Sequence, residues 1–218
     1  MATKFAQCFL STLATIPSSA GLFNPWAARN EDDDLGNGPE SRQARLLAHL
    51  SATNVRYIAV GEAPGYQGAR VSGIPFTSEA LLMSGAIPRL ASTGRLSTRT
   101  LPWKEPSAGI IWELMFRHGM DENTLLWNAC PFHPYAAGPF SNRAPSKSEV
   151  ELGLPLIELM VEFHPSALVL AIGTRASNAL RRLNIRHVAL RHPAYGGKSE
   201  LAKQLENAIR HDTHRQRQ

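Results

Sequence analysis

Four short apolar runs alternate along this chain with segments of helical periodicity, and this alternation constrains the fold most strongly. Each run has the length of a buried strand, and three of them stop at a glycine or an asparagine. The runs cover residues 55–60, 125–127, 167–172 and 187–190, and the predicted helices cover residues 41–51, 107–118, 148–163, 174–183 and 199–209. Parallel strands need crossover helices, which cover both faces of the sheet. The sequence therefore predicts an α/β fold, a three-layer α/β/α sandwich with a central, mostly parallel four-stranded sheet.

The length of 218 residues suits one main domain. We expect an N-terminal helix and acidic loop in residues 1–40, the α/β domain in residues 41–210, and a polar tail in residues 211–218. No apolar run approaches the roughly 18 residues of a membrane span, which excludes a membrane protein. Polar residues interrupt the apolar stretch of residues 5–16, which predicts a packed helix rather than a signal peptide.

Two cysteines, Cys8 and Cys130, are too few for a disulfide framework. Neither has a second cysteine at the spacing of a zinc or cluster hairpin. The cysteine pattern therefore predicts a reducing, cytoplasmic location, and we expect no bound metal.

The charge is divided unevenly along the chain. Residues 1–40 contain two basic and five acidic residues, whereas residues 41–218 contain 21 basic and 13 acidic residues. A basic body with a short acidic flank is typical of a protein whose partner is a polyanion such as nucleic acid. Charge alone does not identify the fold or the reaction.

The loops that follow the four strands hold nearly every unusual local pattern of the chain. They cover residues 61–78, 128–146, 173 and 191–198. In open parallel sheets, ligands bind at the carboxyl ends of the strands. We therefore expect the functional groups in these loops.

Four segments of these loops resemble, in order, the motifs of one family. Gly61-Glu62-Ala63-Pro64-Gly65 follows the first strand and precedes residues 73–79, Gly-Ile-Pro-Phe-Thr-Ser-Glu. Asn128 ends the second strand, Ser141-Asn142-Arg143-Ala144-Pro145 precedes Glu149, and His192-Pro193-Ala194 follows the fourth strand. Over about residues 55–210 this set resembles the uracil-DNA glycosylase superfamily.

The resemblance implies an enzyme of base excision repair. It would flip uracil, or another deaminated or 5-substituted base, out of DNA and hydrolyse the N-glycosidic bond to leave an abasic site. The implied partner is DNA that contains uracil or a related lesion. We expect a monomer that needs no cofactor and does not bind membranes.

Three side chains would form the base pocket that the resemblance implies. Phe76 would stack on the extracted base, and Asn128 would pair with N3–H and O4 of uracil, which disfavours cytosine. His192 would donate a hydrogen bond to O2 as negative charge accumulates on the departing base. The rest of the implied base-binding loop consists of Gly61, Ala63, Pro64 and Gly65.

Two carboxylates compete for the role of positioning the attacking water. Glu62 lies in the first loop, as in the iron–sulfur branch of the family, and Glu79 falls where a related branch has an aspartate. We favour Glu79, because its additional methylene still permits reach to the sugar.

The sequence departs from the family at three points. Ala63 stands where the best-known branch has an aspartate, and Gly65 stands where it has a tyrosine that excludes the methyl group of thymine. Without that ring we expect tolerance of 5-substituted uracils. The iron–sulfur branch needs four cysteines, so two cysteines exclude its cluster.

Contacts to the DNA itself would come from aromatic and basic side chains near the loops. Tyr195, flanked by glycines, would enter the gap left by the flipped base, with Lys198 near a phosphate. The further candidates for phosphate contacts are Arg70, Arg143 and Lys147.

Two other functions fit parts of the sequence. A non-catalytic protein that binds uracil or damaged DNA would keep the pocket without hydrolysis, and the missing aspartate at Ala63 favours it. A thiol hydrolase would use Cys130 with His133, although no third residue is placed to orient the pair.

Overall fold

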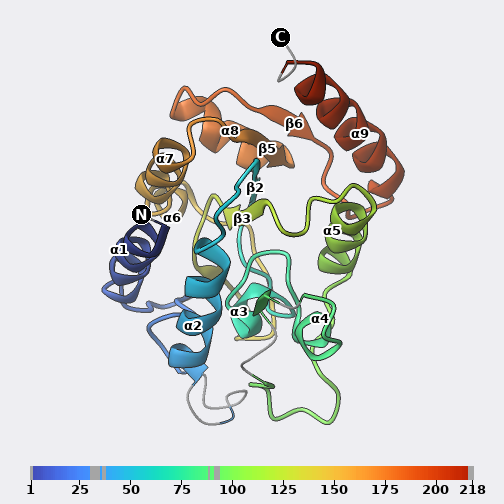
Figure 1. The fold of residues 1–218 in the computed structure, drawn as a ribbon. Helices are drawn as coiled ribbons and strands as arrows, with labels where there is room; N and C mark the ends of the chain where they lie inside the picture. Colours follow the sequence, from blue (N-terminus) through green and yellow to red (C-terminus); the bar gives the residue numbers. More distant parts are fainter. Residues whose placement is uncertain (1, 30–34, 36–37, 88, 91–93, 216–218) are drawn as a thin grey trace.

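The centre of the molecule is a four-stranded parallel sheet with the strand order β3-β2-β5-β6 (Figure 1). The computed structural model describes residues 2–29, 35, 38–87, 89–90 and 94–215. The strands are β2 (Tyr57–Gly61), β3 (Thr124–Asn128), β5 (Leu168–Ile172) and β6 (Val188–Leu190). The predicted α/β sandwich is thereby confirmed, and the strands fall where the apolar runs predict them.

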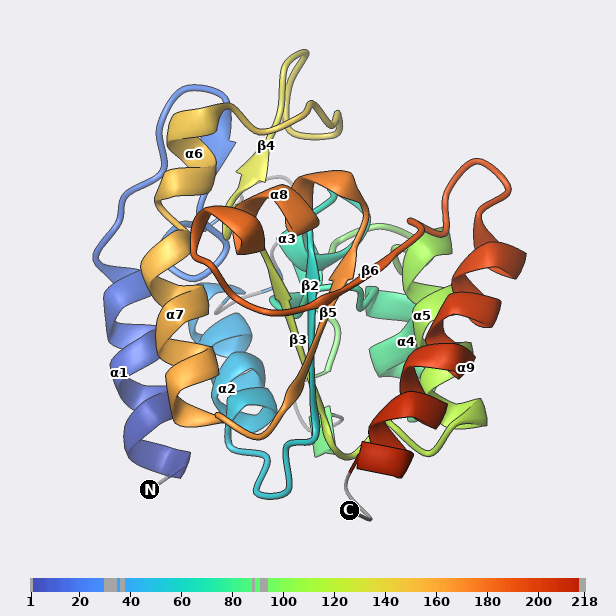
Figure 2. The ribbon, with the colours of Figure 1, turned by 90° about the horizontal axis from the view of Figure 1, so that it is seen from above.

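Helices cover both faces of the sheet, as Figure 2 shows. One layer contains α1 (Ala2–Ala14), α2 (Gly38–Leu50), α6 (Lys147–Glu151) and α7 (Leu154–Phe163), and the other contains α4 (Glu79–Met83), α5 (Pro106–Arg117) and α9 (Lys198–Arg215). The short helix α3 (Ala69–Ser72) follows β2, and α8 (Thr174–Arg182) follows β5 and packs on β5 and β2. In the described part of the chain, no helix has the length and hydropathy of a membrane crossing.

A second, two-stranded sheet was not predicted. In it β1 (Leu22–Phe23) pairs antiparallel with β4 (His133–Pro134). Strands of two residues carry no period-2 signal in the sequence, because alternation needs a longer run. The pair joins the N-terminal segment to the loop that follows β3.

The predicted helix over residues 148–163 is two helices, α6 and α7. The capping box at the start of α6 is formed by Ser146 with Glu149, so the first helix begins one residue before the predicted start. A Cβ atom at Gly153, between the helices, would lie 2.0 Å from the carbonyl oxygen of Ala129, so this approach of the two backbones requires glycine. Helix α7 starts at Leu154, and Pro155 follows in its first turn, where the missing N–H is tolerated.

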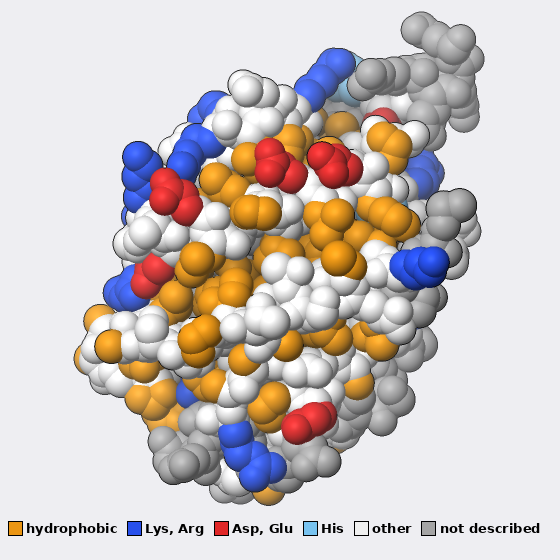
Figure 3. Space-filling model, turned by 90° about the vertical axis from the view of Figure 1, so that its left-hand side faces the viewer, with side chains coloured by type: hydrophobic (Ala, Val, Ile, Leu, Met, Phe, Trp, Pro, Cys, Tyr) orange, Lys and Arg blue, Asp and Glu red, His pale blue; other side chains and the backbone are white. Residues whose placement is uncertain are grey.

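The ends of the chain differ from the expectation in part. The predicted N-terminal helix is present as α1, whereas most of the predicted acidic loop lies outside the described residues. Helix α9 continues to Arg215, so residues 211–215 are helical rather than a tail. Figure 3 shows the face of α1, α6 and α7, where hydrophobic side chains gather in the middle and Lys and Arg lie along the edges.

A buried carboxylate, Glu79, holds the long connection between α4 and α5. Its side chain is 0% exposed. Oε1 accepts hydrogen bonds from the backbone N–H groups of Leu96 at 2.9 Å and Ser97 at 2.7 Å, and Oε2 accepts from the Ser97 hydroxyl and from the Trp103 N–H at 3.2 Å. Arg95 Nε lies 3.5 Å from Oε2. These donors compensate the buried charge and fix the backbone of residues 95–103.

We expect Glu79→Ala to lower the free energy of unfolding by about 3–5 kcal/mol, because it leaves buried donors without an acceptor. Glu151→Ala is the control, because Glu151 forms an exposed ion pair with Arg182. That substitution should lower the free energy of unfolding by less than about 1 kcal/mol. Urea denaturation measures both. Equal effects of the two substitutions would contradict the structural role of Glu79.

Candidate active site

A cavity of about 220 Å³ lies at the carboxyl ends of the strands. It brings together Phe76, Asn128 and His192, which lie far apart in the sequence. Its lining consists of Glu62, Ala63, Pro64, Gly65, Ala69, Phe76, Glu105, Ser107, Asn128, Asn142, Arg143 and His192. A larger groove of about 1030 Å³ lies beside α9 at the amino ends of β5 and β6, and its lining contains none of the sequence-predicted site residues. We therefore place the candidate site in the smaller cavity.

The end of β2 lies close enough to the pocket to require glycine. In the ladder of β2 and β3, Gly61 pairs with Asn128. A Cβ atom at Gly61 would lie 2.3 Å from the Phe76 ring and 2.6 Å from Asn128 Oδ1. The missing side chain therefore allows both groups to approach the strand end.

Phe76 adopts a backbone conformation that is unusual for an aromatic residue. Its φ is +52°, in the left-handed region, and its side chain is buried. Such a conformation is strained for a residue with a Cβ and persists only when the surroundings impose it. The effect is to place the ring against Gly61 and Asn128 in the cavity wall.

Backbone hydrogen bonds continue past the end of the ladder and join the loops after β2 and β3. The Ala129 N–H donates to the Gly61 carbonyl at 2.8 Å, and the Cys130 N–H donates to the Glu62 carbonyl at 2.8 Å. Asn128, at 3% exposure, is held between these bonds and its own strand. The backbone that carries the side-chain amide of Asn128 is therefore fixed by the sheet and not by a flexible loop.

His192 enters the pocket from the loop after β6. Burial, with a further contribution from Arg191, lowers the pKa of His192, so the ring is neutral at neutral pH. Its Nδ1 accepts a hydrogen bond from the Ala194 N–H at 3.2 Å. In the neutral ring this assignment puts the proton on Nε2, which is then available as a donor.

Of the two competing carboxylates, the cavity contains Glu62. Glu62 Oε1 lies 3.1 Å from Arg175 Nε. Burial raises the pKa of Glu62, and Arg175 opposes that shift. The expectation that favours Glu79 is corrected by the structure, because its carboxylate is enclosed among the donors of residues 95–103 and does not line the cavity.

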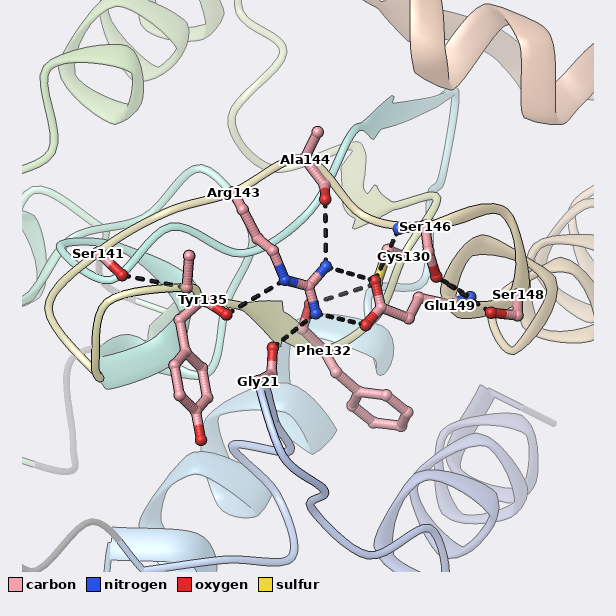
Figure 4. Close-up of polar contacts among 11 residues, drawn as sticks. Gly21, Cys130, Phe132, Tyr135, Ser141, Arg143, Ala144, Ser146, Ser148 and Glu149 are labelled. Carbon is pink, nitrogen blue, oxygen red and sulfur yellow. Dashed lines mark hydrogen bonds and ion pairs between the residues drawn. The ribbon is translucent and has the colours of Figure 1, made fainter.

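Arg143 lines the cavity, but its guanidinium is already occupied (Figure 4). It donates to the carbonyls of Tyr135 at 3.1 Å, Ala144 at 3.1 Å and Gly21 at 2.8 Å. Two further bonds, of 2.7 and 2.6 Å, go to the two oxygens of Glu149. Since a guanidinium has five N–H donors, all are used within the protein. This corrects the prediction of a phosphate contact: Arg143 is a clamp that fixes the loop before α6.

Arg70 does not fit the predicted phosphate contact either. It is 2% exposed, and its guanidinium carbon lies 4.8 Å from the centre of the Phe23 ring and 5.7 Å from that of Phe140. A buried guanidinium stacked on two rings has a packing role that its position in the sequence did not reveal.

The other predicted DNA contacts lie on the surface. Tyr195 is 99% exposed and has a φ of +53° on the loop between β6 and α9. Lys147 is exposed at the start of α6. Lys198 Nζ lies 2.7 Å from Glu113 Oε2. These three contacts with DNA stay predictions.

The pair of Cys130 and His133 does not form a nucleophile with its base. Burial raises the pKa of the Cys130 thiol to about 12, and its Sγ donates to the Phe132 carbonyl at 3.3 Å. Burial lowers the pKa of His133 to about 4, and its Nε2 lies 3.0 Å from the Ser141 carbonyl oxygen. A thiol that stays protonated and a ring that faces other groups do not support a thiol hydrolase.

Four further residues line the cavity without having been predicted as site residues: Ala69 and the polar residues Glu105, Ser107 and Asn142. Asn142 Oδ1 accepts from the Tyr66 N–H at 3.0 Å and so joins two of the loops. In the sequence, Glu105 and Ser107 are typical of the start of a helix, because acidic and hydroxyl residues are common at helix N-termini. Only the position of α5 beside the loop after β2 brings them to the cavity.

Within the described ranges, no group of His, Cys, Asp or Glu side chains is arranged to hold a metal ion.

Comparisons with known proteins identify the family and the fold. The model of the uracil DNA glycosylase superfamily matches residues 48–211. Among solved structures, the chain is similar to wild-type SMUG2 of Pedobacter heparinus, with a TM-score of 0.61 and 20% sequence identity over 97% of each chain. At that identity the similarity shows the fold. No curated protein matches the chain.

We expect Gly61→Ala to displace Phe76 and Asn128, because the new methyl group would overlap both side chains. The cost should be about 1–3 kcal/mol of unfolding free energy, as for other overpacked sites. Gly109→Ala is the matched control, since the space at Gly109 is open. Thermal denaturation measures the stability and a crystal structure the displacement; an unshifted Phe76 ring would contradict the close approach.

We expect Arg143→Lys to destabilise the protein by about 2–4 kcal/mol, because an ammonium group cannot replace the two-pronged bond to Glu149 or the bonds to three carbonyls. Arg210→Lys is the control, since Arg210 forms an exposed ion pair with Glu206 on α9. Chemical denaturation of both variants tests this. A cost for Arg143→Lys as small as that for Arg210→Lys would show that the clamp is dispensable.

Proposed function

This chain belongs to the uracil DNA glycosylase superfamily, and we propose that it flips uracil out of DNA and hydrolyses its N-glycosidic bond, leaving an abasic site. The observation that carries this proposal is the shared cavity of Phe76, Asn128 and His192. An aromatic face, an amide and an imidazole donor are the groups that capture and activation of an everted pyrimidine require.

The two polar groups have different roles in this mechanism. The Asn128 amide offers one donor and one acceptor, which match O4 and N3–H of uracil and oppose the reversed pattern of cytosine. As the glycosidic bond breaks, negative charge accumulates on the base. The Nε2–H of neutral His192 donates to the base oxygen and stabilises that charge.

Glu62 positions the attacking water in this proposal. Arg175, 3.1 Å away, favours the ionised form of Glu62, and an ionised carboxylate accepts hydrogen bonds from water. The sugar carries positive charge in the transition state, which a nearby carboxylate also stabilises. Phe76 provides the face against which the base is held during the reaction.

The surface around the cavity supports DNA binding. Tyr195 lies three residues after His192, so a side chain that is 99% exposed stands beside the proposed base pocket. In this proposal it fills the gap left by the flipped base, while Lys147 and Lys198 contact phosphates. Gly65 presents no side chain to the pocket, which supports acceptance of other deaminated or 5-substituted bases. Action as a cytoplasmic monomer in base excision repair completes the proposal.

We expect the protein to convert uracil in an oligonucleotide to an abasic site, which alkali then cleaves. His192→Ala should lower the rate by about 10²–10³-fold, because it removes a donor to the departing base. Glu62→Gln should lower it by about 10²–10⁴-fold. His211→Ala, on the exposed side of α9, serves as the control.

Two results would contradict this function. Tight, salt-sensitive binding of uracil-containing DNA without an abasic product would identify a binding protein. If the protein neither binds nor cleaves uracil-containing DNA, the assignment of the cavity to a nucleobase is rejected.

A further inference from the structure

A second carboxyl group, that of Glu105, borders the same cavity and has no role in the mechanism above. This carboxyl group packs against two glycines of the loop after β2, Gly65 and Gly68. A Cβ atom at Gly68 would lie 2.3 Å from Glu105 Oε2, and one at Gly65 would lie 3.1 Å from Oε1. Glycine at both positions therefore makes room for this carboxyl group beside the loop after β2.

One of the two oxygens of the Glu105 carboxyl group lacks a polar partner. Oε2 is buried and has no hydrogen-bond partner among the residues that the structure describes. Burial raises the pKa of Glu105 to about 7. By contrast, the buried Glu79 has Arg95 beside it and four hydrogen bonds. A structural carboxylate would be expected to have such partners, so Glu105 calls for a functional explanation.

Among the described residues, no neighbouring cation offsets the burial of Glu105, because no opposite charge contributes to its pKa shift. Arg143 lines the cavity, but its donors go to Glu149 and to three carbonyls. His192 is neutral because burial lowers its pKa. The other charged or titratable residues on the neighbouring elements do not contribute to the pKa shift of Glu105. They are Glu62, Tyr66, Arg70, Lys104, Arg191, Lys198 and Glu113.

The two carboxyl groups of the cavity thus differ in environment. Burial raises the pKa of Glu62, but its ion pair with Arg175 opposes that shift and favours the carboxylate. Glu105 has no such opposing charge, and burial raises its pKa to about 7, so a substantial fraction keeps its proton near neutral pH. Two carboxyl groups in such different environments can divide the tasks of accepting and donating hydrogen bonds, with Glu62 as the acceptor and the protonated fraction of Glu105 as the donor.

We propose that Glu105 contacts the everted base and, in its protonated form, donates a hydrogen bond to an acceptor atom of the base as negative charge develops there. This inference rests on the proposed glycosylase function. Its physical basis is that a neutral acid stabilises the departing anion, whereas an ionised carboxylate at the same place repels it. Glu105 would then be a base-contacting residue in addition to Asn128 and His192.

The first test is the pH dependence of single-turnover cleavage of uracil-containing DNA. The wild-type rate should fall as the pH rises through about 7, because Glu105 loses its proton. Glu105→Gln keeps an N–H donor but cannot ionise, so its rate should not fall in that range. Glu105→Ala should be slower by about 10–100-fold at pH 6. The same alkaline decline in wild type and Glu105→Gln, or an undiminished Glu105→Ala, would overturn the inference.

The second test separates a contact with the base from a structural role. 5-Fluorouracil leaves more readily as an anion than uracil, so it depends less on a donor that stabilises the leaving base. The rate lost in Glu105→Ala should therefore be smaller for 5-fluorouracil than for uracil. Equal losses on both bases would point to a structural defect and reject the contact. Glu158→Gln, on the exposed side of α7, is the matched control.

The third test distinguishes failure of this inference from failure of the proposed function. Binding of DNA that contains non-hydrolysable 2′-fluoro-2′-deoxyuridine is measured by fluorescence anisotropy at pH 6 and pH 8, relative to the same DNA with thymidine. Wild type should show a uracil preference that weakens at pH 8, and Glu105→Gln a preference that does not change. This pattern without cleavage would reject hydrolysis and keep the Glu105 contact. Cleavage with the same binding pattern in both proteins would reject the Glu105 contact alone.

Discussion

The parallel pairing of β2 with β3 determines where the site can form. Its last pair joins Gly61 to Asn128, and two backbone hydrogen bonds beyond it join the loops that follow the strands. Because Gly61 has no side chain, the Phe76 ring and the Asn128 amide both approach the strand end. The cavity therefore begins at the carboxyl ends of β2 and β3, and the loops that follow the strands complete it.

The strands follow from local apolar patterns, and the three central pocket residues follow from the resemblance of the loop motifs to the family. Apolar runs mark the strands, Asn128 ends β3, and Phe76 and His192 lie in the loops after β2 and β6. The sequence predicts the partners of charged residues poorly. Glu79 binds donors 17 to 24 residues away and Arg143 binds Gly21, 122 residues away. A residue type indicates a capacity for interaction, whereas only the fold decides whether protein or ligand uses it.

The N-terminal segment is part of the site's support although it precedes the family match over residues 48–211. Its strand β1 pairs with β4, the Gly21 carbonyl accepts from Arg143, and the Phe23 ring lies against Arg70. These contacts fix the loop that carries Asn142. The region recognised as common to the family is thus smaller than the unit that shapes the pocket.

The buried arginines alter how the basic composition of the chain is understood. Arg42 and Arg45 donate to backbone carbonyls inside the molecule, Arg70 lies against two rings, and Arg143 is fully engaged. Attraction of a nucleic acid depends on the cations that displace condensed counterions from its backbone. Guanidinium groups that are buried and bonded within the protein do not contact the nucleic acid, so they displace no counterions from it. The ionic-strength dependence of association should therefore be shallower than the formal charge of +5 and the abundance of arginine suggest.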